Sequence, residues 1–547
     1  MRVKTRAMAA AAVTSLALLA ACGGGGTPDP GTSQPAQAGG EISMRGCTPQ
    51  NSLIPANTGE ACGNDVLDGV LAKLVRYNAD TAAPEMDIAE SIETKDNQTF
   101  TVKLKAGYKF HDGTDVKAKN FVDAWNWSAA GPNAMYNSYF FTPIEGYDDV
   151  QCGANAAGEP DCEGKPPKAD KMTGLKVVDD TTFTIKTSTK VSNLPVRLGY
   201  TVFAPLPDSF VGDPDAYANK PIGAGPFKFD SKSDTEMVIS KFADYSGTDK
   251  PSIDKVTFRI YTNDGTAYND VLANQLDFTD IIPSDRLVGD LYKTELEGRN
   301  LQRETGTISV MAYSPNDPQM KNVKLRQALS MAIDRELINK QIFNGIRPPI
   351  DGWVAPVVDG FKAGACGEYC TYNAEKAKQL YQESGGYNGT LSLSVNGDGG
   401  HGPWAEATCN SIKNTLGLDC VANITPDFKT IRDQIGKREL KGLYRAGWVM
   451  DYPSIENFLA PLYGTGAGSN DTGYSSKVFD DKLAEAAAAP TTEEANKLYQ
   501  EAEGIIAKDF PTIPQWYYLD NVGFSNRVTD VKINPFGNLE LSLIKVK

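Results

Sequence analysis

The chain has 547 residues, of which 41% are hydrophobic and 22% charged, and its formal net charge at pH 7 is −15. Single cores stop growing near roughly 250 to 300 residues, so a chain of this length is expected to form two or three lobes. The composition is that of a globular protein and excludes fibrous and membrane-spanning classes. The acidic balance argues against nucleic acid or an anionic lipid surface as a partner, because both require a basic face.

The N-terminus has the features of an export signal. Three basic residues precede an apolar run, Ala7–Ala21, which is shorter than the ~20 residues of a spanning helix. The run ends in LAAC, which resembles the lipobox of bacterial lipoproteins, where the signal is cleaved before an acylated cysteine. The resemblance implies a signal peptide over 1–21, lipid on Cys22, and a Gly- and Pro-rich tether over 22–40. The alternative is a simple secretory signal cleaved at the same bond.

Nine cysteines are an odd number for an exported chain, and assigning Cys22 to a lipid leaves eight. The eight are near neighbours in sequence, which predicts four local disulfides in an oxidising compartment. Each closes a short loop and contributes up to about 3 kcal/mol. Metal ligation is the alternative, but the chain has two histidines and no CxxC pair, so no metal is expected. The expected pairs are Cys47 with Cys62, Cys152 with Cys162, Cys366 with Cys370, and Cys409 with Cys420.

Strand-like and helix-like segments alternate from Glu41 onward. TFTVKLK, at 99–105, places Phe100, Val102 and Leu104 on one face of a predicted strand. A helix is predicted next, with Val116, Phe121 and Ala124 near helical spacing. Further strands are predicted at TTFTIKT, VTFRIY and LSLSV, which begin at Thr181, Val256 and Leu391.

The clearest helical pattern is VKLRQALSMAIDRELINKQIFNG, with Gly345 as its stop. A second helix begins with a capping-box pattern, Thr491 with Glu494, and closes before Pro511, with strands resuming after Ile513. One apolar face of the first helix is expected to hold Leu325, Ala328, Leu329, Ala332, Ile333, Leu337 and Ile342.

Common catalytic signatures are absent. The chain has no HExxH, GxSxG, GxxxxGK[ST] or post-strand GxGxxG motif, and His111 and His401 are its only imidazoles. Neither an enzyme nor a cofactor is therefore expected.

An alternating run, LYRAGWVMD, carries opposite charges. Strand parity places Arg445, Gly447, Val449 and Asp451 on one side, with the two charged Cα atoms at most ~20 Å apart. Long side chains and a turn at Tyr452 would reduce the gap for a ligand to ~10 Å, the span of a short zwitterionic peptide. Gly447 would let a ligand backbone pair with the strand. The residues alone favour a simpler interpretation, in which Asp451 caps a helix beginning at Pro453 and Arg445 is a surface or ion-paired strand residue.

RAGWVMDY resembles the motif of the oligopeptide-binding proteins of ABC importers, the family 5 extracellular solute-binding proteins. The resemblance covers nearly the whole mature chain, through segments that fall in the family's order. These are LDGVLAKLVRYN, AESIETKDNQTFTVKLKAGYKFHDGTDVKAKNF, PIGAGPFKF, VKLRQALSMAIDRELI, LYRAGW and FPTIPQWYYL.

The resemblance implies roles for site residues. Asp451 would hold the α-ammonium of a peptide, and Arg445 and His401 its carboxylate. Gly447 and Val449 would pair with the peptide main chain, and Trp448 and Tyr136 would line side-chain space. His401 can equally be a surface histidine in a Gly-rich loop. Where peptide binders can carry a lysine, this chain has Asp317, and an acid there would disfavour the shortest peptides.

The implied fold is a periplasmic-binding-protein-like α/β fold of type II, cluster C, with two hinged lobes and an extra inserted domain. Lobe I would comprise 41–67, 208–280 and 519–547, the extra domain 68–207, and lobe II 281–518. The implied function is capture of short peptides by a monomer, lipid-anchored to the outer face of the cell membrane, and delivery to an ABC permease. The same fold also serves binders of sugars, opines or nickel complexes, which remain the alternative.

Overall fold

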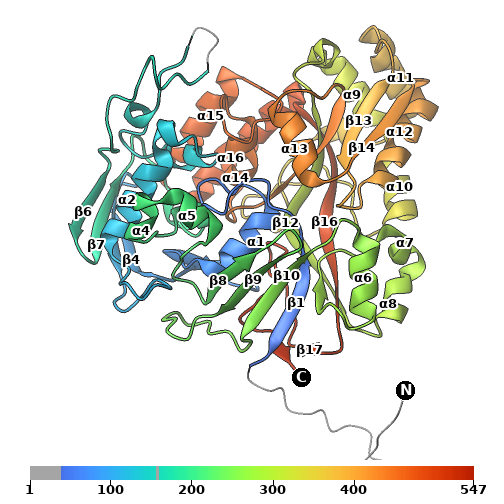
Figure 1. Ribbon diagram of the computed structural model, residues 1–547. Coiled ribbons are helices and arrows are strands. Elements are labelled where there is room, and N and C mark those ends of the chain that lie inside the picture. The colour runs from blue at the N-terminus through green and yellow to red at the C-terminus, as the bar shows by residue number, and fades with distance from the viewer. Residues whose placement is uncertain (1–38, 156–158) are drawn as a thin grey trace, which may run out of the picture. The chain divides into compact units, whose positions relative to one another are not determined.

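Two long antiparallel strands, β12 (Asn300–Tyr313) and β16 (Thr512–Phe524), form the middle of a ten-stranded mixed sheet (Figure 1). The computed structural model describes residues 39–155 and 159–547, which fall in one compact unit. The strand order is β14 (Cys420–Thr425), β13 (Leu391–Asn396), β15 (Leu443–Val449), β12, β16, β11 (Phe278–Thr279), β1 (Glu41–Gly46), β10 (Lys255–Ile260), β9 (Glu236–Lys241) and β8 (Phe227–Lys232).

A separate four-stranded antiparallel sheet carries the first predicted strand. Phe100, Val102 and Leu104 of β5 are at most 3% exposed while their neighbours face solvent, so the predicted alternation is confirmed. The predicted helix is α2, but Val116 lies outside it because α2 begins at Ala118. The sheet has the order β4 (Ala89–Thr94), β5 (Thr99–Leu104), β7 (Thr182–Lys186) and β6 (Leu175–Asp179), with α2 (Ala118–Ala129) packed on it.

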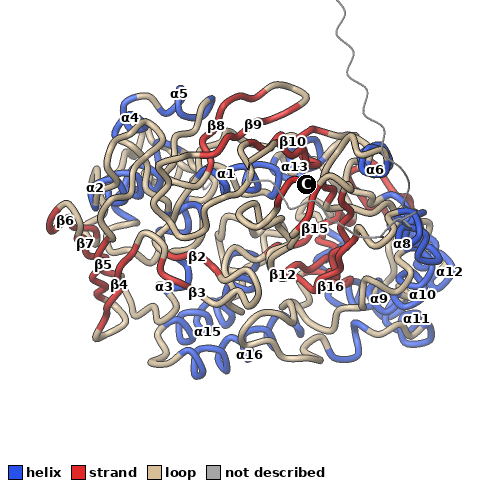
Figure 2. Tube along the Cα trace, turned by 90° about the horizontal axis from the view of Figure 1, so that it is seen from below, coloured by secondary structure: helices blue, strands red, loops and turns tan. Residues whose placement is uncertain are grey.

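The helices lie in groups along these sheets (Figures 1 and 2). One group is α9 (Val323–Met331), α10 (Arg335–Ile342), α11 (Ala374–Glu383) and α12 (Gly402–Leu416), and another is α14 (Glu456–Tyr463), α15 (Lys477–Ala487) and α16 (Thr492–Asp509). The other α-helices are α1 (Ala61–Val70), α3 (Leu194–Arg197), α4 (Asp208–Gly212), α5 (Pro214–Asn219), α6 (Asp264–Leu272), α7 (Ser284–Leu287), α8 (Leu291–Glu295) and α13 (Phe428–Gly436). Two-stranded sheets pair β2 (Val75–Tyr77) with β3 (Pro84–Met86) and β17 (Val528–Thr529) with β18 (Lys545–Val546).

The long helix predicted from 323 to 345 is wrong, because the segment forms α9 and α10 with a break between them. Asp334 causes the break: its side chain accepts from the Leu337 N–H and starts a new helix. The second axis turns Leu337 outward, where it is 47% exposed, although Leu325, Ala328 and Leu329 are buried as expected.

The capping prediction for α16 is confirmed for Thr491, which is the N-cap and whose side chain accepts a hydrogen bond from the Glu494 N–H. The strands predicted at Thr181, Val256, Leu391 and after Ile513 correspond to β7, β10, β13 and β16.

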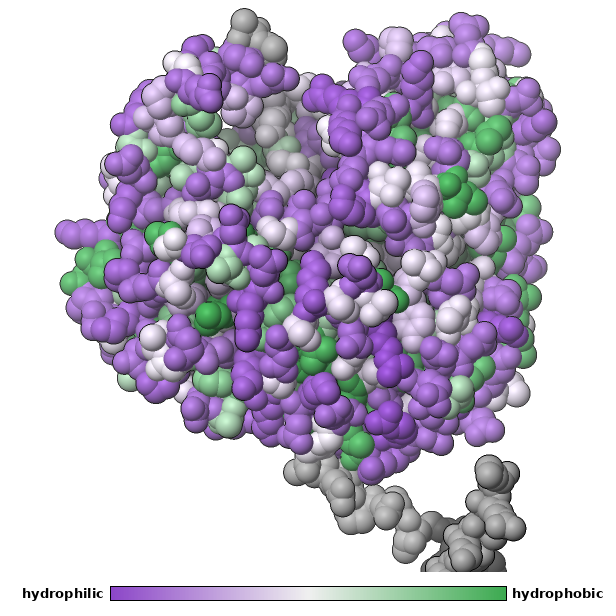
Figure 3. All heavy atoms as spheres, viewed as in Figure 1, coloured by the Kyte–Doolittle hydropathy of each residue, from purple (hydrophilic) through white to green (hydrophobic). Residues whose placement is uncertain are grey.

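Three large hydrophobic clusters divide the interior. One joins β1, β8, β9 and β10 with the C-terminal segment, and a second covers the four-stranded sheet and α2. The third packs between the strands β12–β16 and the helices α9–α12 and α14–α16. On the surface, the face seen in Figure 3 is mostly polar, with scattered apolar side chains.

All four predicted disulfides form: Cys47–Cys62, Cys152–Cys162, Cys366–Cys370 and Cys409–Cys420. Across residues 39–155 and 159–547, no helix is long and apolar enough to cross a membrane, and no group of three metal-binding side chains gathers. The predicted signal peptide and Cys22 lie outside the described residues, as does all of the tether except Gly39 and Gly40.

Candidate functional site

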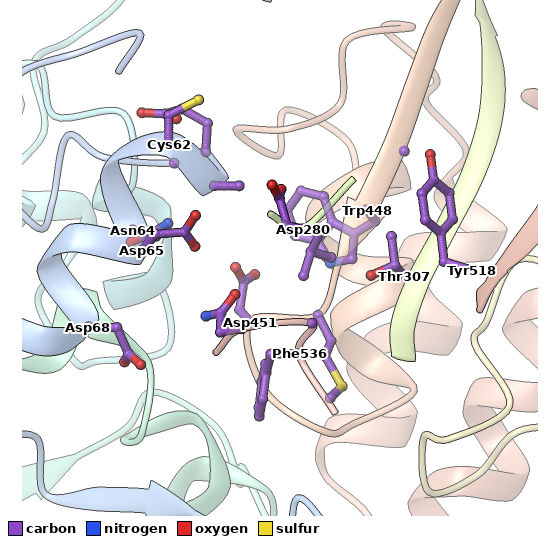
Figure 4. Close-up of a pocket in the computed structure, with 18 of the residues that line it drawn as sticks. Cys62, Asn64, Asp65, Asp68, Asp280, Thr307, Trp448, Asp451, Tyr518 and Phe536 are labelled. Carbon is purple, nitrogen blue, oxygen red and sulfur yellow. The ribbon is translucent and has the colours of Figure 1, made fainter. Parts of the chain in front are cut away.

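A cavity of about 640 Å³ lies beside the exposed edge of β15. Its volume falls within the ~300–1,000 Å³ of typical ligand sites. Its wall is built from distant segments, among them α1, the end of β1, the loop after β13, and β15 with the residues that follow it. Figure 4 shows α1 on one side of the cavity, Trp448 and Tyr518 on the other, and Asp451 between them.

The second half of β15 has one unpaired edge. The backbone N–H and C=O groups of its even-numbered positions point toward β12. At the two ends of the pairing, the Met450 N–H donates to the Gly306 carbonyl and the Ser314 N–H donates to the Gly442 carbonyl. Backbone groups alternate along a strand, so those of Arg445, Gly447 and Val449 point to the other side. The neighbour on that side, β13, pairs with β15 at Leu443 and Tyr444 only. The edge from 445 to 449 is therefore free to pair with an extended ligand.

Asp451 lies just past the end of this edge, held by a buried amide. The Asn457 side chain donates to the Asp451 carboxylate at 2.8 Å and accepts from the Asp451 N–H at 2.8 Å. The same carbonyl oxygen accepts from the Trp448 indole N–H at 2.9 Å. Burial raises the pKa of Asp451 to about 7, although the hydrogen bonds from Asn457 and Tyr200 favour its charged form. The carboxylate forms no salt bridge with a described residue.

The predicted helix-cap alternative for Asp451 is wrong. The following helix, α14, begins at Glu456 rather than at Pro453, and Ile455 occupies its N-cap. Asp451 bonds instead to Asn457 in the first turn of α14 and keeps its carboxylate at the cavity.

Arg445 lies at the opposite end of the free edge. Its guanidinium stacks over Phe428 at 5.5 Å, and its buried Nε has no hydrogen-bond partner within the described chain. Burial lowers the pKa of the guanidinium, which remains a cation at neutral pH. The alternative of a surface or ion-paired strand residue is wrong, since Arg445 lines the cavity and makes no salt bridge with a described residue.

His401 lines the same end of the cavity, and the alternative of an exposed histidine is wrong, because the residue is 9% exposed. Its Nδ1 accepts from the Trp404 indole N–H at 3.0 Å, which leaves the proton of the neutral ring on Nε2. Burial, then Arg445 and two further arginines, lower the pKa of His401 well below its ordinary value. The neutral ring can thus donate through Nε2 to an acceptor in the cavity.

Tyr136, Gly447, Trp448 and Val449 also line the cavity. Tyr136 contacts Ser469 through its hydroxyl, at 3.4 Å. Packing against β12 also favours glycine at position 447, because an added Cβ would lie 2.7 Å from the Ile308 carbonyl oxygen. All seven binding residues expected from the sequence therefore surround one space.

The expectation for Asp317 is wrong in its geometry. This carboxylate is 4% exposed, accepts from the Tyr387 hydroxyl and the Gly442 N–H, and is not part of the cavity wall. Asp317 therefore cannot disfavour a short ligand by facing it.

Sequence reasoning missed Asn457, Tyr200 and Asp65, which come from α14, from the segment before Thr201 and from α1. Asn457 lies six residues after Asp451, beyond the motif RAGWVMDY, and no spacing in the sequence marks it as a partner. Tyr200 and Asp65 come from remote segments with no motif of their own.

Comparison with known proteins identifies the family. The model described as "Bacterial extracellular solute-binding proteins, family 5 Middle" matches residues 83–470. The oligopeptide-binding protein OppA of Bacillus subtilis is 24% identical over 528 residues, 92% of each chain. The murein tripeptide binding protein MppA of Escherichia coli superposes with a TM-score of 0.83 at 20% identity, over 94% of this chain and 99% of that one.

A Haemophilus influenzae OppA complex with the peptide RPPGFSPFR gives a TM-score of 0.81 at 23% identity, over 93% of this chain and 99% of that one. These structures share the fold, so the predicted α/β, periplasmic-binding-protein-like class is confirmed. The chain therefore belongs to family 5 of the bacterial extracellular solute-binding proteins.

Proposed function

We propose that this protein captures short peptides in the cavity beside β15 and delivers them to the permease of an ABC importer. The observation that carries the proposal is the free edge of β15 between two opposite charges that lack ionic partners, Arg445 and Asp451. A zwitterionic peptide offers the complement: an ammonium at one end, a carboxylate at the other, and a main chain that pairs with a strand.

The α-ammonium would pair with Asp451. A buried carboxylate without a cation is costly, and an ammonium at hydrogen-bond distance removes that cost. The amide of Asn457 donates to one carboxylate oxygen and fixes the carboxylate at the cavity.

The peptide carboxylate would pair with Arg445 and accept from His401 Nε2. The other cations of the cavity wall already have acidic partners. These are Arg45 with Asp264 and Asp280, Lys73 with Asp68, Arg76 with Asp249, Arg347 with Asp520, and Arg432 with Asp471. Arg445 is the exception among the described residues that line the cavity.

The proposed lobes follow the expected division: lobe I at 41–67, 208–280 and 519–547, the inserted domain at 68–207, and lobe II at 281–518. The three separate hydrophobic clusters support it, since each draws mainly on one of these parts. Binding would favour a closed arrangement by the difference in affinity between closed and open forms.

The proposal includes the cellular setting. A signal peptide over 1–21, lipid on Cys22 and a tether over 22–40 would hold a monomer at the outer face of the cell membrane. Four disulfides support an oxidising compartment. No catalysis and no cofactor form part of the proposal.

Isothermal titration calorimetry with Ala-Ala-Ala tests the proposal. Asp451→Asn should bind at least tenfold more weakly, because a charge-assisted hydrogen bond contributes about 1.5–3 kcal/mol. Asp471→Asn serves as a control that removes a carboxylate already paired with Arg432.

Equal affinity of the wild type and Asp451→Asn would refute the anchor. Native mass spectrometry of the purified protein addresses the alternative solutes, since a sugar, an opine or a nickel complex as the retained ligand would contradict peptide capture. Cleavage products after incubation with peptides would identify an enzyme instead.

A further inference from the structure

The cavity contains a second carboxylate that a peptide's two termini do not neutralise. Asp65 projects from α1, and Figure 4 shows it facing the space into which Asp451 also points. Its side chain makes no hydrogen bond and no salt bridge with a described residue.

The other acids of the wall differ from Asp65 because each has a partner. Asp68, on the same helix, pairs with Lys73, and Asp280 accepts two hydrogen bonds from Arg45. Arg45 is near Asp65 as well, but its guanidinium is already shared between Asp264 and Asp280. Burial and the neighbouring acids, Asp280 first, raise the pKa of Asp65 well above its ordinary value. Asp65 is thus the one carboxylate of the described wall that has neither a hydrogen bond nor a salt bridge.

The two carboxylates are held separately. Asp65 belongs to α1, whereas Asp451 follows β15 and is fixed by the Asn457 amide, and Figure 4 shows Asp451 between α1 and Trp448. Four other acids of the wall also lack an ionic partner, but each accepts hydrogen bonds within the described chain: Glu60, Asp87, Asp398 and Glu540. A zwitterionic peptide with uncharged side chains pairs with Arg445 and Asp451 and covers the half-buried Asp65 without supplying it a cation, which is unfavourable.

We infer that Asp65 selects peptides that carry a basic side chain, lysine or arginine, at the first or second residue. The inference rests on the proposed function and adds the substrate class. In an extended ligand whose amino group is at Asp451, only side chains near that end approach α1, because successive side chains alternate sides at ~3.3 Å per residue. A basic side chain there supplies the third charge that the cavity requires.

The test compares lysine with norleucine, which keeps the aliphatic chain and lacks the charge. Titration calorimetry measures Lys-Ala-Ala against Nle-Ala-Ala, and Ala-Lys-Ala against Ala-Nle-Ala, for the wild type, Asp65→Asn and the control Asp68→Asn. In the wild type, lysine should improve affinity at least tenfold at one of the two positions. In Asp65→Asn that ratio should fall to within about threefold, and in Asp68→Asn it should persist. Asp65→Ser removes the same charge, so a folding defect in one variant leaves the test intact.

Two results overturn the inference. The first is a lysine-to-norleucine ratio near one in the wild type while Ala-Ala-Ala binds, which would mean that a proton alone satisfies Asp65. The second is a preference for lysine that both Asp65 variants retain. If no tripeptide binds at all, the proposed function fails, and this inference fails with it.

Discussion

Peptide binding should be coupled to deprotonation of Asp451. Burial raises the pKa of this carboxyl to about 7 in the protein alone, whereas an ammonium partner in the complex stabilises the charged form and lowers that pKa. The complex thus binds fewer protons than the free protein, and affinity falls as pH drops through about 7. Above about 7.8 the peptide's own amino group loses its proton, and affinity falls again.

The magnitude follows from these two pKa values. Near pH 7.4 the fraction of protein with protonated Asp451 and the fraction of peptide with a deprotonated amino group together weaken binding only about twofold. At pH 5.5 protonation of Asp451 weakens it about thirtyfold. Affinity for Ala-Ala-Ala should therefore fall about fifteenfold between pH 7.4 and pH 5.5. At pH 7 the carboxyl releases about 0.5 proton and the peptide amine takes up about 0.15, so the net release should be about 0.35 proton for each peptide bound.

Calorimetry in two buffers with different ionisation enthalpies measures both quantities. Ala-Ala-Ala is the suitable ligand, because it has no basic side chain to engage Asp65. Asp451→Asn should bind weakly and without this pH dependence between 5.5 and 7. Constant wild-type affinity over that interval, with no proton release at pH 7, would refute the assignment of Asp451 as a buried amine anchor.

Three further predictions follow from the same structure. Arg445→Met should weaken binding of Ala-Ala-Ala at least tenfold and leave the affinity for its C-terminal amide within about threefold, and equal losses for both ligands in calorimetry would contradict the carboxylate role. Asn457→Ala leaves the Trp448 indole N–H and the Asp451 N–H unpaired. Urea titration should therefore show that the free energy of unfolding falls by about 1–3 kcal/mol, and calorimetry should show weaker peptide binding. Unchanged stability would contradict the role of Asn457. Burial lowers the pKa of His111 to about 4 from a reference near 6.5, so the unfolded state takes up the proton first and stability falls as pH drops from 6.5 toward 4. Relative to His111→Gln, the wild type should lose about 2 kcal/mol between pH 7.5 and pH 5, and parallel pH profiles of the two proteins would contradict the shift.

The sequence predicted the elements whose pattern is local. Alternation placed Phe100, Val102 and Leu104 correctly, and the spacing of eight cysteines predicted the four disulfides. The long helix was wrong because apolar periodicity continues through a break that Asp334 produces with a single hydrogen bond. Apolar periodicity indicates which face of a helix is buried, but it does not detect the point where one helix ends and another begins.

The site shows the same division. Arg445, Gly447 and Asp451 lie within seven residues, so their common cavity could be predicted from one motif. The partners of Asp451 could not: Tyr200 comes from far upstream, and Asn457 is distinguished only by three hydrogen bonds that no spacing encodes. Asp65 is notable because its carboxylate lacks a partner among the described residues, and this is visible only in the folded structure.

A crystal structure of the complex with Ala-Ala-Ala tests the central claim most directly. We predict the peptide amino group within ~2.7–2.9 Å of an Asp451 oxygen, the carboxylate at Arg445, and main-chain hydrogen bonds to residues 445–449. A peptide bound elsewhere, with Asp451 still bonded only to its own chain, would contradict the account.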